Sequence, residues 1–221
     1  MFNRLKKFLG KNPGKPSPEE ENKAAREWYE HKSRLMAEIL GPMHNTVMHA
    51  IVPYAIGGGL DLYYYGQGIP GTGVATKELS ESPNQGSSNR TFSCYEIVLF
   101  TRHPLNLRQA KDKETAFGRA HSNINGILNY VAPFSATASL NENETCEFPA
   151  EMESVGGKCL LFDSYGSRSD ATVRCFGVLA VIEVFRSEMD FARSFGGSEL
   201  LARLKASRHY PYSDLDREPV A

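Results

Sequence analysis

Residues 176–185, FGVLAVIEVF, decide how the rest of the sequence is interpreted. Eight of these ten residues are apolar, and the exceptions are Gly177 and Glu183. A run of this length is buried on both faces, and its Val, Ile and Phe content favours a central β-strand over a core helix. Ser187 can cap a helix and Asp190 places an acid in its first turn. The sequence therefore predicts a central strand that turns directly into a helix.

Helical patterns occur before and after this strand. Ser17-Pro18-Glu19-Glu20 combines a capping serine, a proline at the first helical position and a capping-box acid, and Gly41-Pro42 is expected to end the helix. From about 112 to 130 apolar residues recur at helical spacing, and Pro133 is expected to stop that helix. Two short helices are predicted at about 187–195 and 198–207, the second capped by Ser198.

Four further strands are predicted, at residues 47–56, 60–65, 92–100 and 158–162. The first two are expected to form a hairpin around three consecutive glycines, residues 57–59. Residues 80–89 are expected to be an exposed, mobile loop, and residues 164–170 a turn. Because strands come in hairpin-like groups with helices between and after them, the predicted fold class is α+β: a mixed α/β sandwich with a central, largely antiparallel sheet and long helices packed on it.

Composition limits the classes of function. The 221 residues carry a net charge of -1, which gives no general electrostatic case for nucleic-acid binding. We expect one domain at 17–207, a basic flexible arm at 1–16 and a loose, polar tail at 208–221. The arm lacks the features of a secretion signal, and a membrane-surface role for residues 2–15 is a less favoured alternative. The cysteines at 94, 146, 159 and 175 form no CxxC pair, as in reduced, cytoplasmic proteins.

No motif predicts a cofactor, a metal or a catalytic site. Residues 66–71, GQGIPG, match GxGxxG, but Pro70 and the residues after it do not favour the helix that a dinucleotide site requires. The histidines and cysteines lack zinc spacing. A hydrolase with a cryptic Ser/Cys-His-Asp site, for example one using Asp163 and His121, remains the alternative, although nothing in the sequence positions these residues.

Two groups of residues are candidates for contact with a partner protein. The acidic residues between 142 and 153 form either a solvated loop or a patch that attracts a cationic partner, and they are Glu142, Glu144, Glu147, Glu151 and Glu153. In the run Tyr63-Tyr64-Tyr65, alternate side chains point to opposite faces of a strand, so Tyr63 or Tyr65 is a candidate interface anchor and the others are candidates for the core.

Several linked stretches resemble the suppressor-of-fused domain family. The resemblance covers about residues 44–206 and depends on the order of its motifs. They are residues 44–65 with the glycine turn 66–69, the strand YEIVLF at 95–100, GILNYV at 126–131, LLF at 160–162, residues 176–185 followed by Ser187-Glu188-Met189, and residues 197–204. The chain looks most similar to the single-domain bacterial members, since nothing in it matches the second domain of the animal protein.

That resemblance implies a protein-binding module rather than an enzyme. Bacterial members of the family are protein-binding modules, and some are immunity proteins that neutralise a toxin. We therefore expect this chain to mask or neutralise a partner protein, with a toxin as one candidate partner. The binding of a Gli-type transcription factor is not carried over, because the second domain is missing from the resemblance.

Overall fold

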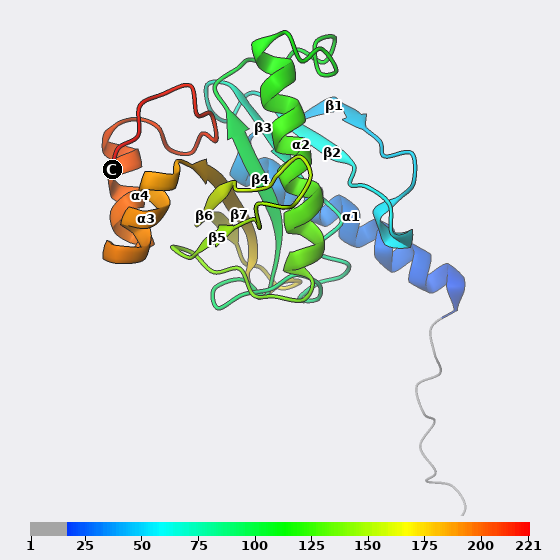
Figure 1. Ribbon diagram of the computed structural model, residues 1–221. Helices are drawn as coiled ribbons and strands as arrows, with labels where there is room; N and C mark the ends of the chain where they lie inside the picture. Colours follow the sequence, from blue (N-terminus) through cyan, green and yellow to red (C-terminus); the bar gives the residue numbers. More distant parts are fainter. Residues whose placement is uncertain (1–16) are drawn as a thin grey trace, which may run out of the picture.

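The computed structural model describes residues 17–221, so the arm expected at 1–16 lies outside the described residues. Figure 1 shows the arrangement of the elements. Within the described part the helices are α1 (Pro18–Leu40), α2 (Ala116–Ser135), α3 (Arg186–Phe195) and α4 (Gly197–Ala206), with a 3-10 turn, η1, at Tyr54–Ile56. The strands are β1 (Met43–Met48), β2 (Leu62–Tyr65), β3 (Thr72–Ala75), β4 (Cys94–Thr101), β5 (Thr145–Glu147), β6 (Cys159–Arg168) and β7 (Phe176–Val184).

These seven strands form one sheet in the order β1-β2-β3-β4-β7-β6-β5. Only the β4–β7 pair is parallel among these strands, and the other five pairings are antiparallel. Between β4 and β7 the chain passes through α2 and the β5–β6 hairpin, and β7 then pairs with β4 in the parallel direction. The prediction of an α+β fold with a central, largely antiparallel sheet is therefore confirmed.

The apolar run at 176–185 is continuous because the side chains of β7 enter three clusters of buried residues. Leu179 and Val181 face the cluster beneath α2, Val178 and Ala180 face α1, and Ile182 belongs with α3 and α4. Alternation along a strand sends these sets to opposite faces, so α2 covers one face and the other three helices cover the other. The predicted central strand followed at once by a helix is confirmed.

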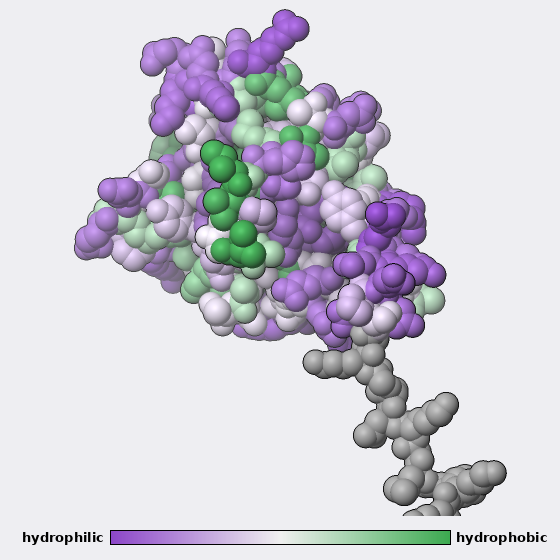
Figure 2. Space-filling view, turned by 90° about the vertical axis from the view of Figure 1, so that its right-hand side faces the viewer, coloured by the Kyte–Doolittle hydropathy of each residue, from purple (hydrophilic) through white to green (hydrophobic). Residues whose placement is uncertain are grey.

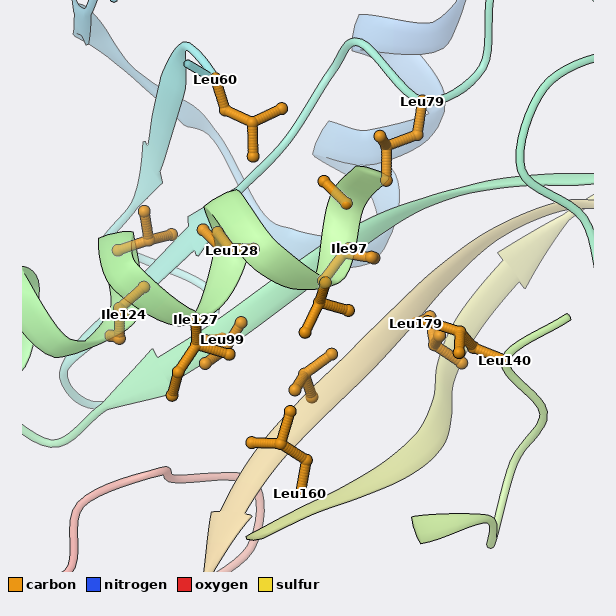
Figure 3. Packing of buried hydrophobic residues seen from close by; sticks show 14 of the residues in the cluster. Leu60, Leu79, Ile97, Leu99, Ile124, Ile127, Leu128, Leu140, Leu160 and Leu179 are labelled. Carbon is orange, nitrogen blue, oxygen red and sulfur yellow. The ribbon is translucent and has the colours of Figure 1, made fainter. Parts of the chain in front are cut away.

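Helix α2 contributes the largest share of one core layer. Its residues Ile124, Ile127 and Leu128 are buried against Ile97 and Leu99 of β4, as Figure 3 shows. The helix begins where the Thr115 hydroxyl accepts a hydrogen bond from the Gly118 amide. It does not stop at Pro133, as predicted, but continues to Ser135. The proline lies in the last turn, where its missing N–H removes one hydrogen bond close to the helix end.

The predicted start of α1 is confirmed in detail. The Ser17 hydroxyl accepts from the Glu20 amide at 3.3 Å, and the Glu20 carboxylate accepts from the Ser17 amide at 2.7 Å, which completes the capping box. Trp28, Met36 and Leu40 are buried against the sheet. The predicted end is also confirmed, since the helix ends at Leu40 and Gly41 follows with a φ of 85°.

The prediction for the first two strands was partly wrong. Strand β1 ends at Met48, because the Asp61 carboxylate accepts from the Ala50 amide at 2.9 Å and turns the chain. The expected second half of that strand contains η1. Strand β3 was not predicted, and it pairs directly with β2, with Tyr65 opposite Gly73. The GxGxxG segment is thus the connection of a hairpin and opens no helix.

The interpretation of three polar stretches was wrong in part. Strand β6 extends to Arg168, through most of the expected turn at 164–170. Ser80 and Ser87, in the loop expected to be exposed, are buried and hydrogen-bonded. Helix α3 begins at Arg186, because the Glu188 carboxylate accepts from the Phe185 amide at 2.9 Å, which makes Ser187 part of the helix rather than its cap.

The terminal residues 208–221 are not loose. The buried Asp214 carboxylate accepts from the Thr101 hydroxyl and from the Arg102 amide, both at 2.6 Å. The buried Arg217 guanidinium pairs with Glu188 at 2.6 Å. Ser198 does not cap α4 either, since α4 begins at Gly197 without a side-chain cap. Side chains of the expected tail therefore complete the packing of β4 and α3.

Candidate functional site

The acidic residues 142–153 lie in the connection from α2 to β6, which folds back over α2. Phe148 and Val155 anchor this connection, since both are buried in the core cluster beneath α2. The Tyr130 ring of α2 lies 6.0 Å from the Phe148 ring, centroid to centroid. A methyl group added at Gly126 would meet Val155 at 3.6 Å. The glycine therefore allows the connection to lie close against the helix.

Two of the five candidate carboxylates have structural partners. Glu147, on the edge strand β5, accepts from Arg186 at 2.6 Å and from Arg193 at 2.8 Å, and these hydrogen bonds lower its pKa to about 2. Glu144 pairs with Arg90 at 2.9 Å and accepts from the Asn141 amide group at 3.0 Å. Glu147 therefore ties β5 to α3, and Glu144 holds its own turn.

The other three carboxylates, Glu142, Glu151 and Glu153, are exposed. Within residues 17–221 none of them has an ion-pair partner. Glu151 and Glu153 lie between the two anchors Phe148 and Val155, so the backbone that carries them is held against α2. These are the acidic residues of the segment that remain available to a partner.

Tyr63 and Tyr65 are buried, with exposures of 5% and 1%, so the surface position expected of an interface anchor is wrong for both. Their strand β2 lies between β1 and β3, and both rings pack under α1. The Tyr65 hydroxyl donates to the Met36 sulfur at 3.9 Å, and burial raises the pKa of both tyrosines. Contact between either ring and a partner protein remains a prediction that no observation supports.

Exposed aromatic side chains occur instead on α2. Tyr130 is 40% exposed and Phe134 is 48% exposed. They are four residues apart and therefore lie on the same side of the helix. Neither residue belongs to the apolar side of α2 that is buried in the core, which carries Ile124, Ile127 and Leu128. The name acid–aromatic surface is used for the exposed rings of α2 and the exposed acids without ion-pair partners in the segment that follows it, which are Tyr130, Phe134, Glu142, Glu151 and Glu153.

A cavity of about 290 Å³ lies beside the first half of α2. At its base, the buried Glu183 carboxylate of β7 accepts from the Lys158 ammonium at 2.8 Å and from the Asn123 amide group. Asp214 also lines the cavity and is held by the donors of β4 described above. Each of these two buried carboxylates thus accepts at least two hydrogen bonds from groups of the fold.

The two residues named for the alternative hydrolase hypothesis, Asp163 and His121, do not hydrogen-bond to each other in the described structure. His121 is buried between the Tyr64 hydroxyl, 2.9 Å from Nε2, and the Ala110 carbonyl, 3.1 Å from Nδ1. Asp163 instead accepts from the Tyr210 hydroxyl at 2.7 Å. Burial raises the pKa of the thiols of Cys94, Cys146 and Cys159, which disfavours the nucleophilic thiolate.

Two further observations concern metals and membranes. In the part of the chain that the structure describes, no group of three or more His, Cys, Asp or Glu side chains is arranged to hold a metal ion. Among the helices described, none has the length and apolar content required to cross a bilayer.

Comparison with known proteins shows a shared fold. The sequence matches no protein-family model and no curated protein. A chain in the Sufu–Fu complex crystal structure aligns with a TM-score of 0.55 and 14% identity, over 89% of this chain and 92% of that chain. The crystal structure of Drosophila Suppressor of Fused aligns with a TM-score of 0.47 and 16% identity, over 82% of this chain and 47% of that chain. From the first of these alignments, the chain has the suppressor-of-fused fold, as its sequence predicted.

Proposed function

We propose that this chain is a non-enzymatic protein-binding module that masks a partner protein carrying a basic surface. The fold supports this proposal, because nearly the whole chain aligns with a chain from a protein–protein complex. The observation that carries it is the acid–aromatic surface. There, two half-exposed rings and three carboxylates without ion-pair partners in residues 17–221 share one helix and the segment that follows it.

The two kinds of side chain have different roles in this proposal. Tyr130 and Phe134 are the anchors, because large aromatic rings bury much apolar area when a partner covers them. The carboxylates attract and orient a cationic partner, since complementary charge acts mainly on the rate of association. Loss of a ring should therefore speed dissociation, whereas loss of the acids should slow association.

The proteins encoded beside the gene are expressed together with this chain. The protein that co-purifies with the chain is identified as the partner. Binding kinetics are then compared between the wild type and the triple variant Glu142→Lys, Glu151→Lys and Glu153→Lys. We expect the association rate to fall by about tenfold or more at low salt, and the difference to shrink at high salt.

A matched control reverses three exposed acids on other elements, and it consists of Glu27→Lys, Glu30→Lys and Glu114→Lys. It makes the same change in net charge, so an equal loss in both triple variants would show that net charge, and not this surface, attracts the partner. The ring variant Tyr130→Ala/Phe134→Ala should raise the dissociation rate with little change in association. Failure of all neighbouring proteins to co-purify would count against the proposal as a whole.

The class of partner can be narrowed to a toxin by a growth assay. If the chain is an immunity protein, its co-expression should restore the growth of cells that produce the neighbouring gene product, and the Glu→Lys triple variant should restore it less well. A partner that binds but does not impair growth would contradict the immunity role while leaving the binding role intact.

A further inference from the structure

The connection between β1 and β2 exposes an apolar surface away from the acid–aromatic surface. Ile51 is fully exposed, Ile56 is 75% exposed and Val52 is 48% exposed. Figure 2 shows a ridge of hydrophobic surface in the middle of the face that carries this connection. We call Ile51, Val52 and Ile56 the apolar ridge.

The fold holds this connection in place. The Gly59 amide donates to the Val52 carbonyl at 3.0 Å, and the Gly58 amide donates to the Pro53 carbonyl at the same distance. The Leu60 amide donates to the Asn129 side chain of α2 at 3.1 Å, and Tyr54 packs against the core. The ridge is therefore a fixed feature of the surface, and three aliphatic side chains on a hydrogen-bonded loop are a costly exposure unless something covers them.

Acidic side chains lie close to the ridge. Asp61 accepts from the backbone of the same connection and pairs with His49 at 2.7 Å. Burial is the main cause of the raised pKa of Tyr54, within η1, and the charge of Glu81 adds to it. A segment that covers the ridge should therefore combine apolar side chains with positive charge, and an anionic membrane surface does not meet this requirement.

The beginning of this chain has that chemistry. Phe2, Leu5, Phe8 and Leu9 recur at helical spacing, and the interleaved basic residues are Arg4, Lys6, Lys7 and Lys11. The described structure begins at Ser17, and helix α1 leads from there to Tyr29, whose hydroxyl lies 3.5 Å from that of Tyr63 on β2. Tyr63 follows two residues after Asp61, so α1 connects the start of the described chain to the surroundings of the ridge.

The length of chain is sufficient for contact. An extended chain reaches about 3.3–3.6 Å per residue, so the eight steps from Leu9 to Ser17 span up to roughly 27 Å. The first three turns of α1, from Pro18 to Tyr29, are only about 17 Å long. A segment on so short a tether has an effective concentration on the order of millimolar, which favours it over a second copy of the chain in dilute solution.

We propose that the basic amphipathic segment at residues 2–9 docks on the apolar ridge of the same chain. In the docked state its apolar side chains cover Ile51, Val52 and Ile56, and its lysines face Asp61 and Glu81. This inference does not depend on the proposed function, since it concerns a different surface and an intramolecular contact.

Methyl NMR spectra of the full chain test the proposal. We expect the variant Leu5→Ser/Phe8→Ser to shift the methyl resonances of Ile51, Val52 and Ile56, and to leave those of the buried Ile124 and Ile127 unchanged. The matched control Asn3→Ser/Asn12→Ser changes one polar residue within the segment and one just after it, and should shift none of them. The reciprocal variant Ile56→Asp should restore free backbone mobility, measured by relaxation, to residues 2–9.

Three results would overturn the proposal. Ridge methyl resonances that are identical in the wild type and in Leu5→Ser/Phe8→Ser would show that the segment does not cover the ridge. Shifts that disappear on dilution would assign the contact to a second copy of the chain. Ridge shifts produced by phosphatidylglycerol vesicles, without a difference between the variants, would identify the ridge as a membrane contact.

Discussion

Replacement of Lys32 by methionine is the most informative test of what holds α1 on the sheet. Lys32 is 2% exposed, and its ammonium donates to Glu96 at 3.0 Å and to the carbonyls of Lys77 and Ser80 at 2.6 and 2.8 Å. Methionine fills a similar volume without the charge. The Glu96 carboxylate, itself fully buried in β4, would then lose its only cationic hydrogen-bond donor in the described structure.

The expected cost follows from the partners that remain. Removal of one member of a buried ion pair costs about 3–5 kcal/mol, because it leaves an uncompensated charge. Glu96 would still accept from the Thr76 hydroxyl, the Leu79 amide, and the amide and hydroxyl of Ser80. These four neutral donors place Lys32→Met at the lower end, at about 3 kcal/mol. Glu96→Met should cost more, because it removes the common acceptor of all four donors and leaves the buried Lys32 ammonium without its counter-ion.

Guanidinium denaturation measures both variants, provided that the m-value stays constant. The matched control is Lys23→Met, which removes an exposed lysine from the same helix, paired with Glu27 at 3.8 Å, and should change stability by less than about 0.5 kcal/mol. If Lys32→Met costs no more than this control, or if Glu96→Met costs less than Lys32→Met, the buried network does not hold the helix in the way argued.

Three further predictions concern pH, packing and the terminal segment. Burial raises the pKa of Glu78 from 4.5 to about 7, so the folded state binds this proton more tightly than the unfolded state does. The stability of the wild type therefore falls as the pH rises between these two values. In thermal unfolding, Glu78→Gln should be more stable than the wild type by up to about 3 kcal/mol above pH 7 and equally stable at pH 4. Gly177→Ala places a methyl group 2.2 Å from the Phe92 ring and should cost about 1–3 kcal/mol in urea denaturation, whereas Gly126→Ala, with 3.6 Å to Val155, should be neutral or stabilising. Arg217→Met should destabilise the fold by about 3 kcal/mol, because it leaves the Glu188 carboxylate buried and without its cation; a change in melting temperature within error would show that residues 208–221 are loose after all.

Elements defined by local patterns were predictable from the sequence. The apolar run of β7 identifies a doubly buried strand without knowledge of its neighbours, and the capping box at Ser17 fixes the start of α1 to the residue. The apolar stripe of α2 likewise predicted the face that packs on β4. In each case the deciding interactions lie within one turn of helix or along one strand, so a window of the sequence contains them.

Polar residues that the fold buries were not predictable in this way. Ser80, Ser87 and Asp214 are polar, so the sequence suggests exposed positions for them. Each is nevertheless buried, because a group far away in the sequence supplies its hydrogen bonds. Tyr63 and Tyr65 were misjudged for the same reason, since only the position of β2 inside the sheet and beneath α1 determines their burial. Such pairings join residues far apart in the sequence, and no local pattern encodes them.

The positions of two carboxylates in the sequence nevertheless predict that distant polar groups pack against them. Glu96 and Glu183 each interrupt an apolar run in a strand buried on both faces, and a charge in such a position must be paired or lose its charge. Each receives a lysine from a separate part of the chain, Lys32 from α1 and Lys158 from the connection before β6. A single acid in a doubly buried strand therefore predicts that a lysine or arginine and a polar loop fold over that point. In β4 the cation is Lys32, and the polar loop is the segment 76–80, whose hydroxyl and amide groups donate to the Glu96 oxygens.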